Sequence, residues 1–352
     1  MNAVRDDLRL PDFVTSGTHH ADSVGGHPDG GVPLSIGLDH GTMADAQYLS
    51  VSTFGRAEMF IVIGANGRVG SAVASTLLNA GRPVTAVLHS SDSVAGWRKR
   101  GAHTRVVDIR DRDALRAVFR TGTCAFLLNP NADVSTDTDR EERATVRSIV
   151  AALEGSGLEK VVAASTYGAQ PGERCGDLNV LYDFEQALAA QPIPATIQRG
   201  AYYMSNWDGL LDAAKGGVLP SMLPAGMKIP MVAPADLGKA AARHLLEPTR
   251  DRDVHHVEGP ERYSPQDVAD AFAAEFGNPV RVEIIPRDQW IAAYRKLGFS
   301  AAAAESYARM TAVSVDSGFV MSEPFERGET TLQDYVRALV ARTRGSRDLQ
   351  GA

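Results

Sequence analysis

Three glycines spaced three residues apart are the residues whose type and spacing most directly indicate a binding function. Gly64, Gly67 and Gly70 stand in the run GANGRVG, directly after the apolar run Phe60–Ile63. Gly64 permits a tight turn, Gly67 leaves the backbone open to a close neighbour, and Gly70 allows the next helix to lie near the strand. The N–H groups at the start of that helix would face an anion. The run therefore predicts a cradle for a pyrophosphate, with an ordinary glycine-rich loop as the alternative.

The elements around this turn follow a regular order. Val69, Val73 and Leu77 recur every four residues and predict a helix that ends at Gly81. Expected strands then cover residues 84–88, 105–107, 124–128, 161–164 and 195–198, and expected helices cover 113–120, 138–153 and 178–190. This alternation predicts an α/β fold with a doubly wound parallel sheet, in which ligands bind at the carboxyl ends of the strands.

Composition narrows the class of protein. The net charge of −7 and the pI near 5.7 argue against a general nucleic-acid-binding surface, because neutralising phosphates requires clustered Lys and Arg. Two cysteines, Cys124 and Cys175, exclude a disulfide framework. The sequence has no apolar run of membrane-spanning length and no signal-peptide core. We therefore predict a cytoplasmic protein that acts on a small molecule, without direct nucleic-acid or membrane partners.

Four runs of residues resemble a known family. GANGRVG at the first turn, AFLLNP after the fourth expected strand, VVAASTYGA at the fifth and RGAYYMSN after the sixth are similar to the NmrA-like group of atypical short-chain dehydrogenases. The positions of the last run that fit the family pattern are Arg199, Tyr202, Tyr203, Met204 and Asn206. The resemblance extends over Met59–Leu339. Members of the group include NAD(P)H-dependent quinone oxidoreductases, a triphenylmethane dye reductase, plant phenolic reductases and non-catalytic redox sensors.

The resemblance implies a nicotinamide dinucleotide cofactor and places residues around it. The pyrophosphate would lie against Gly64, Asn66, Gly67, Arg68, Val69 and Gly70, the adenosine ribose near His89 and the adenine near Asp108. The nicotinamide ribose would lie against Leu128, Asn129 and Pro130, and the ring beside Ser165 and Tyr167. A planar substrate would stack on a wall formed by Tyr202, Tyr203, Asn206 and Trp207.

The choice between NADP and NAD rests on the residue after the second expected strand. Many relatives carry Arg there, and an acidic residue would select NAD by binding the ribose hydroxyls. This sequence has His89 followed by Ser90 and Ser91. A cation for the extra phosphate of NADP could come from Arg68, or from Arg98 and Lys99 downstream. We predict NADP as the cofactor, with NAD as the alternative.

The catalytic pair of alcohol-oxidising short-chain dehydrogenases is absent. Those enzymes use Tyr-x-x-x-Lys, in which Lys lowers the phenol pKa. Here Asp177 and Leu181 occupy the two positions. Tyr167 and Tyr182 are nearby phenols without a Lys four residues later, and they are more typical of packing or cofactor contact than of acid catalysis. The catalytic residues therefore stay unassigned, with these two tyrosines as candidates.

Composition and the resemblance together divide the chain into four segments. We predict that residues 1–57 form a low-complexity, disordered leader. The spacing of the histidines in this leader, His19, His20, His27 and His40, matches no metal-binding motif, so we predict no metal site. Residues 58–200 predict a dinucleotide-binding Rossmann domain. We predict that residues 201–345 form a small, mainly helical part that completes the sheet and forms a substrate lid. Residues 346–352 are predicted to form a tail. In the third segment, Ser264 predicts a helix start, and Asp288 another with Ile291 facing inward.

Two functions fit these features. The first is an NAD(P)H-dependent reductase that delivers hydride to a quinone or another conjugated acceptor, a reaction that needs little acid catalysis from the protein. The second is a non-catalytic redox sensor or transcriptional regulator of the NmrA type that binds NAD(P) and changes a partner interaction. An isomerase or epimerase would need an acid–base pair that the sequence does not show. A homodimer is an open alternative to a monomer.

Overall fold

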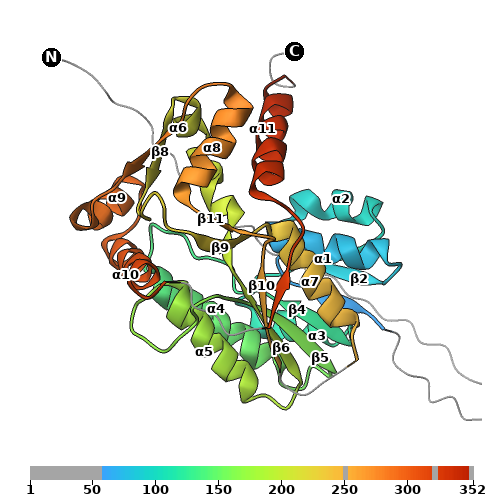
Figure 1. Cartoon of the computed structure of the whole chain (residues 1–352). Helices are drawn as coiled ribbons and strands as arrows, with labels where there is room; N and C mark the ends of the chain where they lie inside the picture. The colour runs from blue at the N-terminus through green and yellow to red at the C-terminus, as the bar shows by residue number, and fades with distance from the viewer. Residues whose placement is uncertain (1–57, 249–252, 319–323, 349–352) are drawn as a thin grey trace, which may run out of the picture. The chain divides into compact units, whose positions relative to one another are not determined.

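The computed structural model describes residues 58–248, 253–318 and 324–348, and short strands of this part form one eight-stranded parallel sheet (Figure 1). The strand order is β13-β10-β6-β5-β4-β1-β2-β3. The strands are β1 (Phe60–Val62), β2 (Val84–Leu88), β3 (His103–Val106), β4 (Cys124–Leu127), β5 (Lys160–Thr166), β6 (Ala195–Gly200), β10 (Asp253–Glu258) and β13 (Phe325–Arg327). The order reverses between β1 and β4, where a doubly wound sheet binds its ligands. The prediction of a doubly wound parallel sheet is confirmed.

Helices cover both faces of this sheet. They are α1 (Arg68–Asn79), α2 (Val94–Lys99), α3 (Arg112–Phe119), α4 (Thr138–Leu153), α5 (Asp177–Ala189) and α7 (Pro234–Leu246). Alternate strand residues point to opposite faces. Phe60 and Val62 pack with α1 and α7, whereas Ile61 and Ile63 pack with α3, α4 and α5. Burial on both faces explains why central strands such as β1 and β4 are continuous apolar runs in the sequence.

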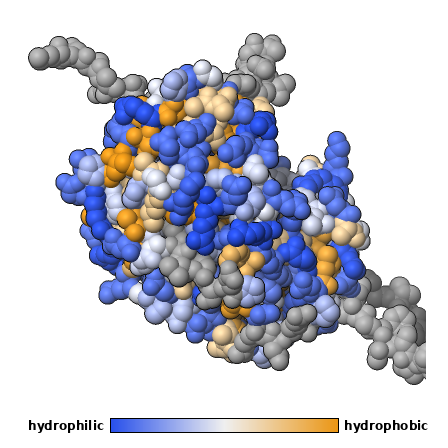
Figure 2. Space-filling view, viewed as in Figure 1, coloured by the Kyte–Doolittle hydropathy of each residue, from blue (hydrophilic) through white to orange (hydrophobic). Residues whose placement is uncertain are grey.

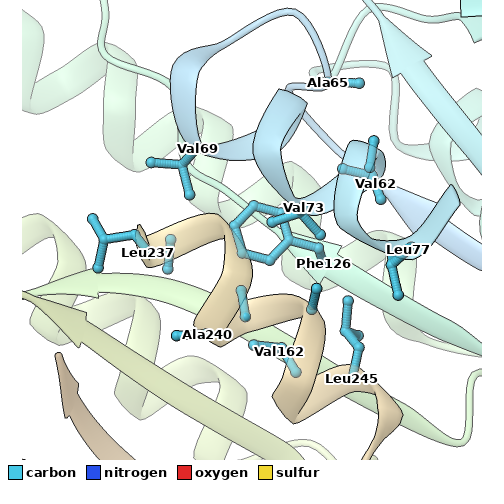
Figure 3. Close-up of a cluster of buried hydrophobic side chains, with 14 of the residues drawn as sticks. Val62, Ala65, Val69, Val73, Leu77, Phe126, Val162, Leu237, Ala240 and Leu245 are labelled. Carbon is cyan, nitrogen blue, oxygen red and sulfur yellow. The ribbon is translucent and has the colours of Figure 1, made fainter. Parts of the chain in front are cut away.

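The contact between α1 and α7 is unusually close. A side chain at Gly238 of α7 would place its Cβ 2.3 Å from the Cβ of Ala72 on α1. Figure 3 shows side chains of these two helices, Val73 and Leu237 among them, gathered over Phe126. Because α7 comes late in the chain and α1 follows the glycine turn, this packing fixes the turn against the C-terminal half.

Residues 201–348 contribute strands as well as helices. β10 and β13 extend the main sheet beyond β6. A three-stranded sheet contains β7 (Tyr202–Tyr203), β9 (Ile229–Val232) and β11 (Arg262–Tyr263), and a two-stranded sheet contains β8 (Val218–Ser221) and β12 (Arg281–Ile284). The helices here are α6 (Leu211–Lys215), α8 (Pro265–Phe276), α9 (Trp290–Lys296), α10 (Ala301–Ser317) and α11 (Leu332–Asp348). This part also contains the 3-10 helices η2 (Met204–Leu210) and η3 (Arg287–Gln289), and a further one, η1 (Ser91–Ser93), follows β2.

Three local predictions for this part have clear outcomes. The start of α8 is confirmed, because Ser264 and Asp267 form a capping box. The inward orientation of Ile291 was wrong: Ile291 is 47% exposed, and Trp290, the preceding residue, is buried instead. The tail boundary at residue 346 was also wrong, since α11 continues to Asp348. The predicted leader, residues 1–57, and the last four residues of the predicted tail lie outside the described residues.

The surface in Figure 2 is mainly hydrophilic, with hydrophobic side chains in separate patches. Among the described residues, none of the helices is both long and apolar enough to cross a bilayer.

Candidate dinucleotide site at the carboxyl end of the sheet

The glycine turn leaves an open helix start at the point where β1 ends. Gly64 has φ +68°, in the left-handed region that favours glycine, and the N–H of Gly67 donates to the carbonyl oxygen of Gly64 at 2.8 Å. The first turn of α1 has no capping side chain and no acidic residue. Its N–H groups have no acceptor within the helix and lie at the positive end of the helix dipole. The turn is therefore suited to an anion.

Each glycine of the turn has little room for a side chain. A Cβ on Gly70 would lie 2.2 Å from the carbonyl oxygen of Gly64, and one on Gly67 would lie 3.2 Å from the same atom. A Cβ on Gly64 would lie 2.8 Å from Cδ2 of Leu128. Leu128 follows β4, so this contact joins the ends of the two central strands. The turn is a bare-backbone cradle directly at the switch point of the sheet.

Asn66 connects the turn to α2. The indole Nε1 of Trp97 donates to Oδ1 of Asn66 at 3.0 Å, and the guanidinium of Arg100 lies 4.2 Å above the Trp97 ring. Trp97 is only 5% exposed. Trp97 was not among the residues predicted from the sequence, although a single indole four residues before Gly101 could have been noted as a candidate for burial against the turn. Asn66 thus positions α2 against the turn.

Arg68 interacts with the C-terminal half of the chain. Its Nη1 lies 2.5 Å from Oδ2 of Asp208, whose side chain is 5% exposed, and the Tyr335 hydroxyl donates to the same carboxylate at 2.9 Å. Burial raises the pKa of Asp208, and the Arg68 charge opposes that rise. The Arg68 side chain stays 52% exposed. It can therefore meet a phosphate only in competition with Asp208, a partner that no local sequence pattern indicated.

The residues predicted for the adenosine end lie at the same edge of the sheet. His89 follows β2 and Asp108 follows β3, and both are exposed. The backbone N–H of Arg110 donates to Oδ1 of Asp108 at 2.8 Å. Nε of Arg98 donates to the Thr104 hydroxyl at 3.2 Å, which holds this cation along α2 and β3. The structure therefore places a histidine, not a guanidinium, directly after β2.

Asn129 provides a test of whether a nicotinamide nucleotide fits. Asn129 is 8% exposed, and its Oδ1 is buried without a hydrogen-bond partner among the described residues. A buried carbonyl-type oxygen normally accepts a hydrogen bond. A ribose hydroxyl or a carboxamide N–H group at this strand end would donate one. Together with the glycine cradle, this atom makes the carboxyl end of β1 and β4 suitable for a nicotinamide dinucleotide. Pro130 follows and is exposed.

Ser165 belongs to a buried ion-pair network. Its hydroxyl donates to Oε1 of Glu185 at 2.5 Å, and the Arg199 guanidinium binds both oxygens of the same carboxylate at 2.9 and 2.6 Å. Ser165 and Glu185 are buried. The network holds the ends of β5 and β6 together beside the predicted ring position. The predictions for Ser165 and Arg199 did not include Glu185, the residue that joins them.

Neither candidate phenol gains support as an acid. Tyr167 is 1% exposed and packs in the core with α1 and α7, and the centroid of its ring lies 5.6 Å from that of the His256 ring, in an edge-to-face arrangement. Burial raises the pKa of Tyr167, and the nearby Glu258 raises it further. A phenol that is enclosed by core side chains is poorly placed to protonate a substrate. Tyr182 is half-buried on α5.

Two carboxyl groups lie at this end of the molecule in an enclosed environment. Burial, and then the charge of Asp177, raise the pKa of Glu142 on α4 to about 8. Burial raises the pKa of Asp177, the first residue of α5, to about 6. Tyr203 and Tyr307 are near enough to Asp177 for its charge to raise their pKa values as well. The position that holds a phenol in alcohol dehydrogenases of this fold thus holds a carboxyl group that retains its proton more readily than usual.

The residues predicted to form a substrate wall, Tyr202, Tyr203, Asn206 and Trp207, do not form one open surface. Trp207 is 4% exposed within the core of the C-terminal part, and its ring lies 5.9 Å from that of Tyr202. Tyr203 packs on the opposite side, against the core around α1 and α7, because neighbouring strand residues alternate. Asn206 is exposed and hydrogen-bonds the Tyr202 hydroxyl. The prediction that Trp207 forms a stacking surface is corrected, since η2 turns its side chain inward.

Comparisons with known proteins agree with this fold. A model of the NmrA-like family matches residues 57–335. An NAD(P)H azoreductase from Xenophilus azovorans is 23% identical over 258 residues, which cover 73% of this chain and 87% of that protein. An NADPH-dependent quinone oxidoreductase from Escherichia coli, solved with NADPH, has a TM-score of 0.66 and 21% identity, covering 80% of this chain and 99% of the other. A Citrobacter triphenylmethane reductase solved with NADP(H) has a TM-score of 0.65 and 17% identity, with 80% and 99% covered.

Proposed function

We propose, since the chain belongs to the NmrA-like family, that it is an NAD(P)H-dependent reductase that transfers hydride to a quinone, a dye or another conjugated small molecule. The observation that carries the proposal is the bare-backbone turn at the open start of α1. The azoreductase, the quinone oxidoreductase and the triphenylmethane reductase support the acceptor class, because their substrates are all conjugated molecules.

Residues at the carboxyl end of the sheet would each bind a different part of the cofactor. The turn from Gly64 to Gly70 would bind the pyrophosphate, and Asn129 would accept a hydrogen bond at the nicotinamide end. When bound, the reduced nicotinamide supplies the hydride. NADP(H) is favoured over NAD(H), because no acidic residue directly follows β2 at His89 and both solved relatives hold the phosphorylated form. Thermal shift with all four dinucleotides tests this choice, since a ligand that binds only the folded state raises its melting temperature.

A proton must follow the hydride onto the acceptor. Hydride addition to a conjugated acceptor leaves a delocalised anion that water can protonate, so the Tyr-x-x-x-Lys pair is not required. Asp177 occupies the first position of that pair and is the candidate donor, because burial raises its pKa to about 6. We expect Asp177→Asn to lower kcat about tenfold and to flatten the pH profile above pH 6, with partial rescue by Asp177→Glu. An unchanged kcat and pH profile, with NADPH binding intact, would remove Asp177 from the reaction.

The reductase is tested by NADPH consumption with a panel of quinones and azo dyes. The wild-type chain should show steady turnover, and Gly67→Trp should abolish it by filling the cradle. Gly96→Ala on α2 is the matched control, because nothing lies within 4 Å of its Cβ position. A wild-type chain that binds NADPH but reduces none of the acceptors would contradict the reductase.

A sensor is the second candidate, favoured by the bridge from Arg68 to Asp208 and Tyr335. A bound phosphate would compete for Arg68 and so change how α1 contacts η2 and α11. A sensor must bind the oxidised and reduced dinucleotides with different affinities, because only differential affinity shifts a two-state equilibrium. Equal affinities measured by calorimetry would exclude it.

A cytoplasmic location and a homodimer are further parts of the proposal. Both cysteines, Cys124 and Cys175, are free thiols, as is usual in a reducing compartment.

A further inference from the structure

Two imidazoles and a carboxylate converge at the amino end of the sheet, away from the glycine turn. Oε1 of Glu326 on β13 lies 3.0 Å from Nε2 of His244 on α7 and 2.9 Å from Nδ1 of His255 on β10. The three ligand-type atoms all lie within 4.8 Å of one another. We infer that His244, His255 and Glu326 bind a divalent transition metal, with zinc as the best fit. This inference does not depend on the proposed function.

The buried ring of His244 has unmet bonding capacity. His244 is 2% exposed, and neither of its ring nitrogens makes a hydrogen bond within the described part of the chain. Glu326 lies 3.0 Å from Nε2 but not in the direction required for a hydrogen bond. Buried imidazole nitrogens normally have partners. A metal ion between Nε2 and the carboxylate would use the nitrogen lone pair that the protein itself leaves unused.

The far nitrogen of each imidazole faces a second carboxylate. Nε2 of His255 lies 3.2 Å from Oδ2 of Asp253, and Nδ1 of His244 lies 3.5 Å from Oε2 of Glu247. Metal-binding histidines usually donate their other N–H group to a carboxylate, which fixes the ring and makes it a better ligand. In this cluster each imidazole has a carboxylate within 3.5 Å of its other nitrogen, close enough to accept such a bond once a metal ion orients the ring.

The remaining charges also suit a cation. Arg243 binds Oε2 of Glu326, while Oε1 faces the two imidazoles and is hydrogen-bonded with Nδ1 of His255 at 2.9 Å, so an ion would take the place of that proton. Lys160, at the start of β5, donates to the carbonyl oxygens of His244 and Glu247. The cluster also contains the three carboxylates of Glu326, Asp253 and Glu247. Its net charge is therefore negative when the two histidines are neutral.

The donor set selects the class of metal. Imidazole nitrogen suits zinc, copper and nickel, whereas magnesium and calcium prefer oxygen alone. Two histidines, one glutamate and a water complete a tetrahedral zinc site. The ion would connect the edge strand β13 to α7 and to β10. It would lie at the opposite end of the sheet from the cofactor turn, so it would take no part in the hydride transfer.

The experiment uses the untagged, chelator-treated full chain, titrated with Zn²⁺ by calorimetry and with Co²⁺ by visible absorption. His255→Gln and Glu326→Gln should bind one equivalent less than the wild type and lose the Co²⁺ band of tetrahedral geometry. His103→Gln, an exposed histidine of β3, is the matched control and should behave as the wild type. Histidines in residues 1–57 are present in every variant, so their contribution cancels in the difference.

A milder variant guards against misfolding. Asp253→Asn alters only the outer carboxylate, at a half-exposed position, and should weaken Zn²⁺ binding ten- to a hundredfold. Zinc should also raise the melting temperature of the wild type, but not that of Glu326→Gln. Equal zinc stoichiometry and affinity in all variants would overturn the inference and leave the cluster as an ion-pair network. Absence of the tetrahedral Co²⁺ band in the wild type would overturn it as well.

Discussion

The two ends of the same parallel sheet use different parts of the chain for binding. At the carboxyl end the groups available to a ligand at the turn Gly64–Gly70 are backbone N–H groups, because close contacts leave no room for side chains on its glycines. At the amino end the groups are the side chains of His244, His255 and Glu326, brought together from three separate elements. A backbone site requires residues that are small and contiguous. A side-chain site requires only that distant elements meet.

The largest expected effect tests the backbone character of the carboxyl end. Gly70→Ala would place a Cβ 2.2 Å from the carbonyl oxygen of Gly64, so the turn must open. We expect NADPH affinity to fall at least a hundredfold, measured by calorimetry, with the circular dichroism spectrum retained. Gly96→Ala, where there is space for a Cβ, should bind NADPH as the wild type does. Normal binding by Gly70→Ala would show that the cradle does not depend on bare backbone.

The second-largest expected effect is on the pH dependence of stability, and it concerns Glu142 and Asp177, the buried acidic side chains near the carboxyl ends of the strands. Because the pKa of Glu142 is raised to about 8, the folded chain holds a proton between pH 5 and pH 8 that the unfolded chain has lost. The free energy of unfolding should therefore fall as pH rises through this range. Glu142→Gln cannot ionise and should be more stable than the wild type at pH 8, by on the order of a few kcal/mol, and similar at pH 5.

Urea denaturation at several pH values measures this difference between the wild type and Glu142→Gln. Glu154→Gln, at the exposed end of the same helix, is the control and should leave the pH dependence unchanged. If the two variants had the same pH profile, Glu142 would ionise normally and the enclosed pair would not hold a proton.

The smallest effect concerns Arg68, the side chain that joins the turn to the C-terminal half. Asp208→Asn removes the competing charge, so we expect NADPH to bind about threefold more tightly. Arg68→Met should weaken binding by a similar factor, since a half-exposed ion pair contributes about 1 kcal/mol or less. The double variant should resemble Arg68→Met alone. Additive effects of the two substitutions would mean that Asp208 does not act through Arg68.

The sequence anticipated the carboxyl end better than the rest of the molecule. Local signals are sufficient there, because three glycines after a buried strand specify the turn, and parallel strands bring His89, Asp108 and Asn129 to one edge. The orientation of the aromatic side chains from Tyr202 to Trp207 was harder to predict. The sequence Tyr202–Trp207 does not show that η2 turns Trp207 into the core and separates it from Tyr203. Whether an aromatic ring is exposed or buried depends on what packs over it.

The glycine spacing, the strand–helix alternation and the Ser264 cap follow from the sequence by itself, because each depends on neighbours within a few residues. The tertiary structure alone decided that Arg68 pairs with Asp208, that Ser165 and Arg199 share Glu185, and that His244 and His255 meet at Glu326. These contacts join residues far apart in the chain. Their formation depends on how η2 packs against α1, how α5 packs against β5 and β6, and how α7 and β13 pack against β10, which no local pattern specifies.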